Sequence, residues 1–353
     1  MKSIYASDLW IADVRETLGT LPELDALADR SVLLTGCTGL IVSAVADLLI
    51  QWNCANTRKI RIYAAGRSIE KIRERFSPYD REEWFHCVPY DATAVDNRLS
   101  GDCDYIIHGA GNSSPHMIVR EPVETMLSNF TGLKYLLDHA KESGTECVLY
   151  ISTSEVYGKK EGNRPFRTDE YGYIDLLDSR SSYSVGKRAA ETLCAAYADE
   201  YGVKPVIIRP GHIYGPTARP EDRHVSSAWA YAAARGEEIV MKSDGAQIRS
   251  YCYCLDSASA ILTAMIKGES VRAYNISNPD SIISIRQMGE FIAAEGNSGF
   301  RMELPTDAER KGFNPMSNSS LDSGELLGLG WRALFDAKRG FSHTVRILRE
   351  IAE

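Results

Sequence analysis

The stretch SVLLTGCTGL, residues 31–40, joins an apolar strand to an apolar helix through a turn that contains two glycines. This arrangement is typical of dinucleotide-binding turns, because the unpaired N–H groups at the start of the helix attract a pyrophosphate. Gly36 permits the tight turn, and Gly39 lets the backbone approach the phosphates. The third position of the glycine spacing is Val42, so the motif taken alone also fits an ordinary tight loop. The residues expected to contact the dinucleotide here are Gly36, Thr38, Gly39 and Leu40.

Apolar strands alternate with helices on the carboxyl side of this turn. Predicted strands cover residues 31–35, 60–66, 86–91, 105–111, 147–153 and 204–210, and predicted helices cover residues 40–51, 69–75, 123–142 and 182–200. Strands that are apolar throughout, rather than alternately apolar and polar, are typical of a parallel sheet covered on both faces. The sequence therefore predicts an α/β fold with a Rossmann-type, doubly wound parallel sheet.

The regular alternation ends near Gly211, which indicates three parts of the chain. We predict a helical extension over residues 1–29 and a dinucleotide-binding Rossmann domain over residues 30–211, which segments near 250–278 complete. A smaller α+β lobe for substrate binding is expected mainly within residues 212–353.

Composition narrows the classes of function. The 353 residues include 40 Lys and Arg against 48 Asp and Glu, a net charge of −8, with no basic stripe, so we expect no nucleic-acid partner. No apolar run is long enough for a signal peptide or a membrane span, so we expect a cytoplasmic protein without a membrane partner. The eight cysteines are not paired at metal-ligand spacings, which indicates reduced thiols and no metal site. Cys252 and Cys254 are expected on one face of a strand.

The ends of the second and third predicted strands bear on the choice of cofactor. Gly66 is followed by Arg67, where an acidic residue would receive the ribose hydroxyls of NAD. Arg67 could neutralise the 2′-phosphate of NADP or stack on adenine, and it could also be an exposed residue at a strand end. Asp91 is placed to contact adenine, although an Asp at this position also commonly forms a turn. The predicted cofactor is therefore NAD or NADP.

A phenol and an ammonium, those of Tyr183 and Lys187, lie four residues apart and therefore on one face of a helix. A phenol has a pKa of about 10, so we expect Lys187 to lower the pKa of Tyr183 until Tyr183 can act as a base. The preceding predicted strand ends in STSEVYG, residues 152–158, at the edge where open α/β sheets bind ligands. Thr153 is expected to hydrogen-bond a substrate hydroxyl, with the carboxylate of Glu155 close by.

Several short motifs occur together in this chain. They are TGCTGLIV (35–42), HGAGNSSP (108–115), the pair Asn129 and Gly132, STSEVYG (152–158), YSVGK (183–187), RPGHIYGP (209–216), IRSYCYCLD (248–256) and LGLGW (327–331). In this order and spacing they resemble the extended short-chain dehydrogenase/reductase family, which comprises nucleotide-sugar epimerases, dehydratases and decarboxylases. The resemblance covers residues 31 to about 335.

The resemblance implies a tightly held nicotinamide cofactor that oxidises the C4 hydroxyl of a sugar to a ketone. It implies that Thr153, Tyr183 and Lys187 form the catalytic group, that Asn129 supports the active-site helix and that Ala110 contacts the cofactor. The implied partner is a nucleotide-sugar substrate, with UDP- or dTDP-linked sugars favoured.

On the substrate side, the resemblance implies that Arg249 binds the nucleotide diphosphate as a charge-assisted donor. His212 occupies the position where many relatives have Asn beside the substrate phosphate, and it could equally be a hydrogen-bonded structural residue. Ser114 is also expected to contact the substrate.

The segment STSEVYG resembles that of UDP-glucuronate decarboxylases, which have Ser-Glu after the catalytic Thr. The dTDP-glucose 4,6-dehydratases more often have Asp-Glu, and Ser154 is a far poorer proton donor than that Asp. Simple 4-epimerases usually lack a counterpart of Glu155. We therefore expect a lyase that decarboxylates or dehydrates the keto sugar. In a decarboxylase, Arg310 or Arg249 could hold the substrate carboxylate.

Two alternatives stay open at this point. One is a nucleotide-sugar 4-epimerase or keto-sugar reductase of the same family. The other, from a different class, is a catalytically silent dinucleotide-binding scaffold, although such relatives typically lose the Tyr or the Lys of the catalytic group.

Members of the family often form homodimers through two helices of each subunit, one of them the helix with the catalytic Tyr, so we expect a homodimer. An apolar stripe on this helix would suit such a contact, and it would equally suit packing against the sheet. The stripe consists of Ala189, Ala190, Leu193, Ala196 and Tyr197.

Overall fold

A seven-stranded parallel sheet forms the centre of the computed structural model, which describes residues 2–97, 99, 101–160, 162–303, 305–306 and 316–352. Its strands are β1 (Ser31–Thr35), β2 (Arg61–Gly66), β3 (Phe85–Pro89), β4 (Tyr105–His108), β5 (Cys147–Ile151), β6 (Pro205–Pro210) and β10 (Arg272–Ile276). Their order is β10-β6-β5-β4-β1-β2-β3, and every pairing is parallel. The order reverses between β1 and β4, so the carboxyl ends of these strands form the crevice where such sheets bind ligands. The predicted Rossmann-type sheet is confirmed.

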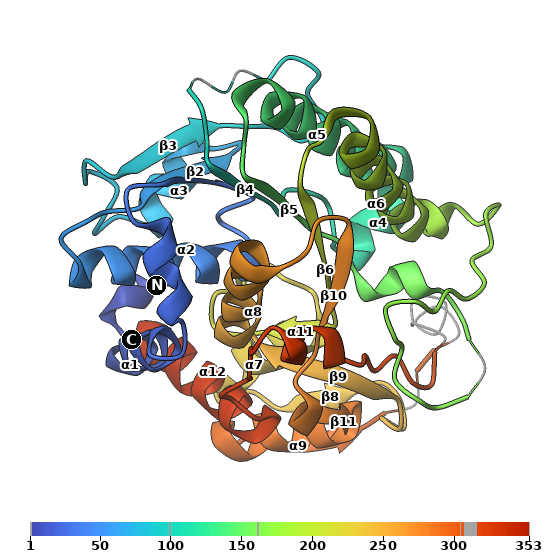
Figure 1. Cartoon of the computed structure of the whole chain (residues 1–353). Helices are drawn as coiled ribbons and strands as arrows, with labels where there is room; N and C mark the ends of the chain where they lie inside the picture. Colours follow the sequence, from blue (N-terminus) through green and yellow to red (C-terminus); the bar gives the residue numbers. More distant parts are fainter. Residues whose placement is uncertain are drawn as a thin grey trace.

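Helices cover both faces of this sheet (Figure 1). α2 (Leu40–Ala55) and α8 (Cys254–Lys267) pack together on one face, and α5 (Pro122–Ser143) and α6 (Ser182–Tyr201) pack together on the other. α3 (Ile69–Arg75) lies against β2 and β3. β1 is buried along its whole length, which explains why its sequence is apolar without alternation.

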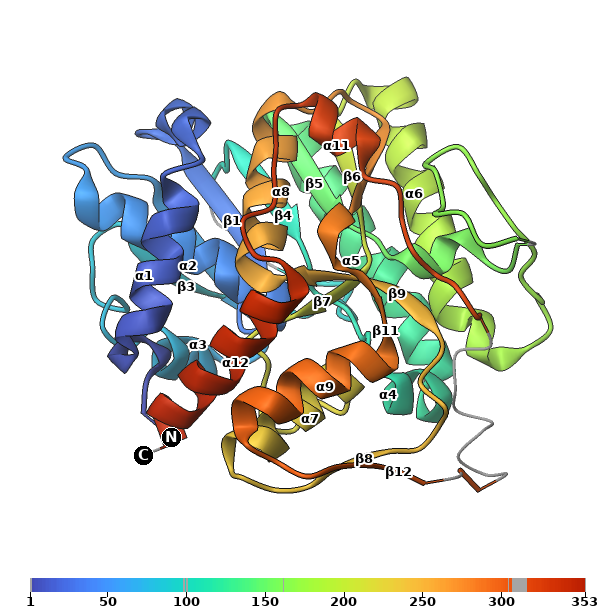
Figure 2. The same cartoon turned by 90° about the horizontal axis from the view of Figure 1, so that it is seen from below.

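A smaller lobe of helices and strands begins directly after β6. Its strands are β7 (His212–Tyr214), β8 (Ile239–Met241), β9 (Ile248–Tyr253), β11 (Ile282–Ser284) and β12 (Phe300–Met302), and its longer helices are α7 (Val225–Ala234), α9 (Ile285–Gly296) and α12 (Ala337–Ala352). One small sheet has the order β11-β9-β7, and β8 pairs with β12. The three helices contact one another, as Figure 2 shows.

Cys252 and Cys254 do not share a strand, so the expectation from their spacing is wrong. β9 ends between them, and Cys254 is the first residue of α8. The start of α8 is held by Asp256, whose carboxylate accepts hydrogen bonds from the backbone N–H groups of Leu334 and Phe335 at 2.8 and 3.0 Å. All eight cysteines are free.

The N-terminal residues are part of the packed structure. They form η1 (Ile4–Ala6), α1 (Asp8–Leu18) and η2 (Pro22–Leu27). Trp10 is fully buried, and α1 contacts α2, α8 and α12. The backbone N–H of Lys2 donates to the carbonyl oxygen of Ile351 at 2.8 Å, so the two ends of the chain lie side by side (Figure 2).

The short elements are α4 (Pro115–Arg120), η3 (Ser154–Tyr157), η4 (Ser179–Ser181), η5 (Pro279–Ser281) and α11 (Gly324–Gly328).

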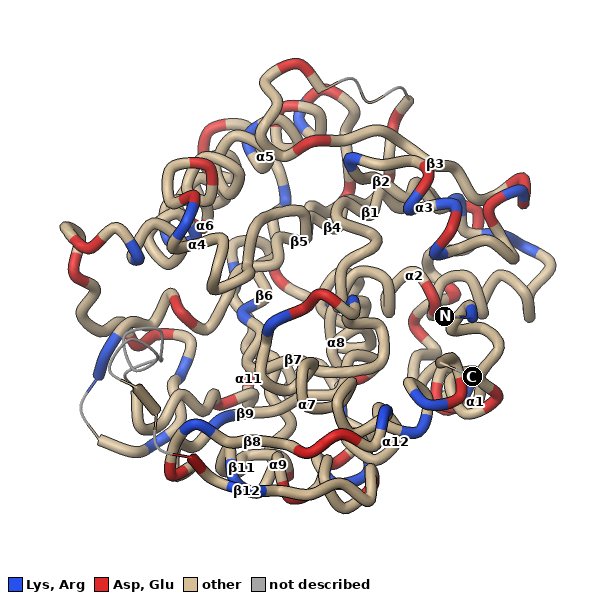
Figure 3. The backbone as a smooth tube through the Cα atoms, turned by 180° about the vertical axis from the view of Figure 1, so that it is seen from behind, with Lys and Arg blue, Asp and Glu red and all other residues tan. Residues whose placement is uncertain are grey.

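Basic and acidic residues are interleaved along the chain (Figure 3). None of the helices in the described ranges is long and apolar enough to cross a membrane. No cluster of three or more His, Cys, Asp or Glu among the described residues could hold a metal ion.

Candidate active site

Gly36 brings the turn between β1 and α2 against the loop that follows β4. Its φ is +72°, and a Cβ on Gly36 would lie 2.8 Å from the backbone N of Ala110 and from the carbonyl oxygen of Gly109. Only glycine fits this position without strain. The N-cap residue of α2 is Gly39. Because glycine has no side chain, the start of this 16-residue helix has no capping side chain. Such a helix start suits a pyrophosphate.

Two residues of the second lobe contact the same turn. The guanidinium of Arg219 donates to the hydroxyl of Thr38 and, at 3.3 Å, to the carbonyl oxygen of Thr38. The hydroxyl of Thr217 donates to the carbonyl oxygen of Leu40 at 2.8 Å. Sequence reasoning missed Arg219, because an Arg in an irregular polar stretch carries neither a periodic signal nor a motif.

Arg67 and Asp91 follow adjacent strands, β2 and β3. Arg67 is exposed, and the carboxylate of Asp91 accepts hydrogen bonds from the N–H and the hydroxyl of Thr93 at 2.9 and 2.8 Å. Burial acts to raise the pKa of Asp91, but these hydrogen bonds and the charge of Arg67 lower it overall. Asp91 thus forms a local turn, and it also interacts with the charge of Arg67 at the strand ends.

Thr153, Tyr183 and Lys187 come together at the carboxyl end of β5. Tyr183 is buried in the first turn of α6, and its side chain hydrogen-bonds that of Thr153. The ammonium nitrogen of Lys187 lies 6.0 Å from the centre of the Tyr183 ring and 4.7 Å from the centre of the Tyr150 ring. The same nitrogen donates to the carbonyl oxygen of Ile151 at 2.7 Å.

The pKa of Tyr183 is raised, not lowered as the Tyr–Lys spacing predicted. Burial is the main cause and the charge of Glu155 adds to it, whereas the hydrogen bond with Thr153 and the charge of Arg180 act in the opposite direction. Lys187 is also buried, and burial lowers its pKa to about 7. Lys187 is therefore only partly charged at neutral pH, and it does not by itself make Tyr183 acidic.

Glu155 is paired with Arg180, a residue that sequence reasoning did not single out. Two guanidinium nitrogens donate to the two carboxylate oxygens at 3.0 and 3.2 Å. Arg180 lies in η4, just before α6, and Glu155 lies in η3, just after β5. The pair therefore joins the two segments that carry Tyr183 and Thr153.

A buried ion pair fixes α6 to the sheet below the site. Arg209 of β6 donates to the carboxylate of Glu191 on α6 at 2.6 and 3.0 Å. The hydroxyl of Ser152, which follows β5, donates to the same carboxylate at 2.5 Å. The turn of α6 that follows Lys187 is thus tied to both β5 and β6.

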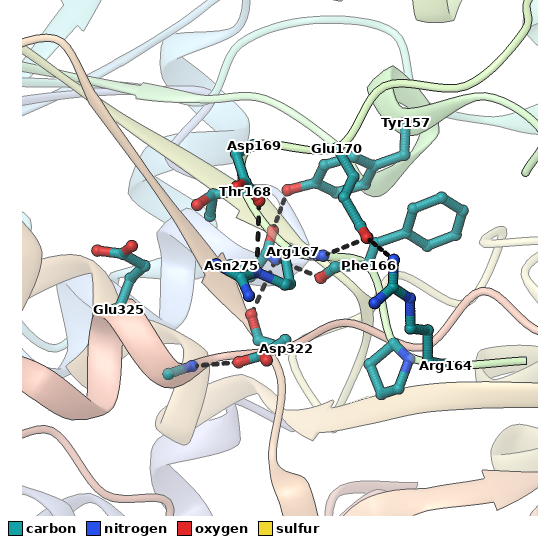
Figure 4. A network of polar contacts seen from close by, with 12 residues as sticks. Tyr157, Arg164, Phe166, Arg167, Thr168, Asp169, Glu170, Asn275, Asp322 and Glu325 are labelled. Atoms are coloured by element: carbon teal, nitrogen blue, oxygen red, sulfur yellow. Dashed lines mark hydrogen bonds and ion pairs between the residues drawn. The ribbon is translucent and has the colours of Figure 1, made fainter.

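The segment after Glu155 is fastened to the edge strand β10. Figure 4 shows the hydroxyl of Tyr157, which donates to Oδ1 of Asn275 at 2.5 Å. The amide nitrogen of Asn275 donates to the carbonyl oxygens of Phe166 and Asp322 at 3.0 and 2.9 Å. These contacts hold the irregular chain between η3 and η4 against the sheet.

Arg249 is a buried side chain and His212 is a half-buried one, and both have unused hydrogen-bonding capacity. Nδ1 of His212 is buried without a partner, and burial together with the charge of Arg249 lowers the pKa of His212 to about 3. Arg249 is 4% exposed, and within the described residues its guanidinium donates only to the carbonyl oxygen of Ile248, at 2.8 Å. Burial lowers the pKa of Arg249. A buried cation without a counter-ion is costly, so this pair suits an anionic ligand such as a diphosphate.

The other predicted residues occupy separate places. Asn129, on α5, donates to a backbone carbonyl one turn earlier at 2.8 Å, and its Oδ1 is buried without a partner. Ser114 is the N-cap residue of α4 and is partly exposed. Ser154 is the first residue of η3. Arg310 lies outside the described residues.

A family model matches the part of the chain that builds this site. The NAD dependent epimerase/dehydratase family matches residues 32–277, a range that includes the glycine turn and Thr153, Tyr183 and Lys187. The chain belongs to this family. Membership of the NAD dependent epimerase/dehydratase family confirms the expected class of enzyme and the dependence on a nicotinamide cofactor, which it gives as NAD.

Individual relatives are similar to this family member over most of its length. UDP-glucuronic acid decarboxylase 1 from Xenopus tropicalis is 27% identical over 97% of this chain and 80% of its own length. UDP-glucuronic acid decarboxylase 6 from Arabidopsis thaliana is 30% identical over 80% of this chain and 77% of its own length. The solved structure of DesIV, a dTDP-glucose 4,6-dehydratase from Streptomyces venezuelae with NAD and TYD bound, has a TM-score of 0.76 at 22% identity, covering 91% of this chain and 97% of DesIV. That likeness shows the same fold.

Proposed function

We propose that this enzyme decarboxylates UDP-glucuronic acid. In this reaction C4 of the sugar is oxidised with NAD, the C6 carboxylate leaves as carbon dioxide, and the C4 ketone is reduced again. The observation that carries the proposal is the meeting of Thr153, Tyr183 and Lys187 at the end of β5, in a chain similar to UDP-glucuronic acid decarboxylases over four-fifths or more of its length.

NAD, when bound, supplies an acceptor for hydride and a positive charge. The residues that would hold it suit its chemistry. The uncapped start of α2 and the close approach at Gly36 suit the pyrophosphate, and Arg67 and Asp91 suit the adenosine end. The buried, unpartnered Oδ1 of Asn129 suits a hydroxyl or amide donor.

Oxidation of the sugar requires that its C4 hydroxyl lose a proton. Tyr183, as phenolate, would take this proton while Thr153 hydrogen-bonds the same hydroxyl. Because burial raises the pKa of Tyr183, the phenolate needs positive charge nearby. Protonated Lys187 would provide it, since its ammonium nitrogen lies 6.0 Å from the centre of the Tyr183 ring. The pKa of about 7 for Lys187 lets it both hold and release a proton near neutral pH.

Loss of carbon dioxide follows from the C4 ketone. The C5–C6 bond breaks, its electron pair moves toward the C4 carbonyl, and the carboxylate leaves as carbon dioxide. Arg249 and His212 would hold the nucleotide diphosphate, because the buried guanidinium of Arg249 and the buried Nδ1 of His212 have hydrogen-bonding capacity left for an anion. Tyr183 would return its proton to the C4 oxygen when C4 regains its hydride.

A screen of UDP-, dTDP-, GDP- and CDP-linked sugars, read by the mass of the product, tests this proposal. We expect UDP-glucuronic acid to lose carbon dioxide and give a UDP-pentose. Loss of water from a hexose, or a change of configuration without a change of mass, would instead identify a dehydratase or an epimerase. No change with any nucleotide sugar would contradict the enzymatic proposal altogether.

We propose a homodimer formed through α5. Apolar side chains on this helix are exposed: Val123 (63%), Met126 (40%), Leu127 (52%) and Phe130 (38%). In contrast, Ala190 and Tyr197 of the predicted α6 stripe are buried in the core beside the sheet, so much of that stripe follows the packing alternative. Light scattering should give twice the chain mass for the native protein and a monomer for Leu127→Asp.

A cytoplasmic location is also part of the proposal, supported by eight free cysteines, which suit a reducing compartment. Fractionation of the producing cells with an antibody against the chain tests it.

A further inference from the structure

Asp222 and His224 form a hydrogen-bonded pair at the start of α7. Nδ1 of His224 lies 2.6 Å from one carboxylate oxygen of Asp222, and the other oxygen accepts the hydroxyl of Ser227 at 2.8 Å. The backbone N–H of His224 also donates to Asp222, at 3.1 Å. Because a carboxylate accepts at Nδ1, that nitrogen carries a proton, and Nε2 is the nitrogen free to act on a ligand.

The surroundings of His224 place it beside the candidate active site. Its side chain is 45% exposed, and within the described residues Nε2 has no partner. The negative charge of Glu155 acts on His224, and His224 in turn acts on the ring of His212. His224 therefore interacts electrostatically with Glu155, in the segment that follows β5, and with His212, and five residues before it Arg219 contacts Thr38 of the glycine turn.

We propose that Nε2 of His224 donates the proton that replaces the carboxylate on C5 of the sugar, and that Asp222 is the positioning residue for this transfer. This inference deepens the proposed function and rests on it.

The step balances without any further reactant. When the C5–C6 bond breaks, its electron pair becomes part of a C4–C5 enolate and carbon dioxide leaves. The enolate then uses this pair to form a C5–H bond with the proton of Nε2, C4 becomes a ketone again, and imidazolium becomes neutral imidazole. The partly exposed ring regains its proton from water. Decarboxylation of a carboxylate consumes one proton overall, so an acid is required in addition to the base that acts at C4.

Other titratable side chains near the site are less suited to this task. Tyr183 serves the C4 oxygen, and Lys187 donates to a backbone carbonyl. His212, with a pKa of about 3, is neutral at physiological pH. Glu155 is engaged in an ion pair with Arg180, and the hydroxyl of Ser154 is a far weaker acid than an imidazolium.

The charges around His224 favour its protonated form. The hydrogen bond to Asp222 raises its pKa, burial opposes this, and the charges of Asp222 and Glu155 add to the increase. His212, the other titratable group that interacts with it, is uncharged at neutral pH and does not oppose protonation.

Turnover of UDP-glucuronic acid in D₂O tests the proposal through the position of the deuterium. We expect the native enzyme to place deuterium on one face of C5, as seen by proton NMR of the UDP-pentose. His224→Asn should lower kcat tenfold or more and place deuterium on both faces, because solvent then protonates the enolate. Formation of reduced nicotinamide in a single turnover should change less than twofold. His343→Asn, which removes a His–Asp pair distant in the chain (His343 with Asp13, 3.0 Å), is the matched control and should keep single-face deuteration.

Asp222→Asn tests the positioning role. Because the acid must be protonated, kcat falls as pH rises through the pKa of His224. Loss of the Asp222 charge lowers that pKa, so the limb should move to lower pH, an effect that a merely structural role would not produce.

The outcomes separate the two proposals. If the native enzyme neither reduces its nicotinamide nor forms a UDP-pentose, the proposed function fails and this inference with it. If the native enzyme is active but His224→Asn keeps kcat within twofold and deuterates one face only, the inference alone is overturned.

Discussion

The side chain of Val42 occupies the space that a side chain at Gly109 would need. A Cβ on Gly109 would lie 2.4 Å from Cγ2 of Val42 and 3.1 Å from Cδ1 of Ile151. Val42 occupies the position of the third glycine of the dinucleotide motif. In this chain the residue without a side chain at this contact is Gly109, on the loop after β4. The close approach of α2 to the loop is thus kept, because the larger residue, Val42, lies on the helix and the glycine, Gly109, lies on the loop.

The first prediction concerns this fit. Gly109→Ala should lower the free energy of unfolding by about 2 kcal/mol, because the β-branched Val42 cannot move aside cheaply. Part of that loss should be absent when the same change is made in a Val42→Ala background, with a coupling energy of about 1 kcal/mol or more in denaturant unfolding. Gly328→Ala, with nothing within 4 Å of its added Cβ, is the control. Equal costs in both backgrounds would contradict the fit.

The second prediction concerns Arg249, a buried cation with no acidic partner among the described residues. Arg249→Met should weaken binding of UDP by about 10- to 100-fold in calorimetry, since charge-assisted hydrogen bonds to a phosphate are lost. The melting temperature of the free protein should stay the same or rise, because a buried charge without a counter-ion has been removed. Arg58→Met, at a side chain that is 65% exposed, should change neither quantity. A large fall in stability without any change in UDP affinity would show a structural role instead.

The third prediction concerns the pH dependence of sugar oxidation. The rate of oxidation should rise with pH as Tyr183 loses its proton. The charge of Glu155 raises the pKa of Tyr183 and that of Arg180 lowers it. Glu155→Gln should therefore move the rising limb to lower pH, and Arg180→Gln should move it to higher pH. Single-turnover formation of reduced nicotinamide at a series of pH values measures both. Shifts in the same direction would mean that loss of the ion pair changes the geometry of the site and that the charges of Glu155 and Arg180 do not set the pKa of Tyr183.

The fold and the proximity of Thr153, Tyr183 and Lys187 could be predicted from the sequence because they follow from local patterns. Apolar strands such as SVLLT are buried on both faces, and the four-residue spacing of Tyr183 and Lys187 fixes their common helix face. The break between Cys252 and Cys254 could not be predicted, because their spacing also fits a strand, and the contacts of Asp256 with backbone groups 78 and 79 residues later exist only in the folded chain.

The electrostatics of the site were less accessible from the sequence. Spacing gives the neighbourhood of Tyr183 and Lys187, whereas their pKa values depend on burial, which is a property of the assembled fold. Arg180, Arg219 and His224 lie in irregular stretches without periodicity, and only the folded chain brings them to the motifs.

The central claim is that Tyr183 removes a proton from a sugar hydroxyl so that NAD can oxidise the carbon. Absorbance of reduced nicotinamide, recorded after UDP-glucuronic acid is mixed with stoichiometric NAD-loaded enzyme, measures this step directly. The native enzyme should show a transient rise, and Tyr183→Phe should bind NAD equally well but show no rise. An undiminished rise in Tyr183→Phe would contradict the account.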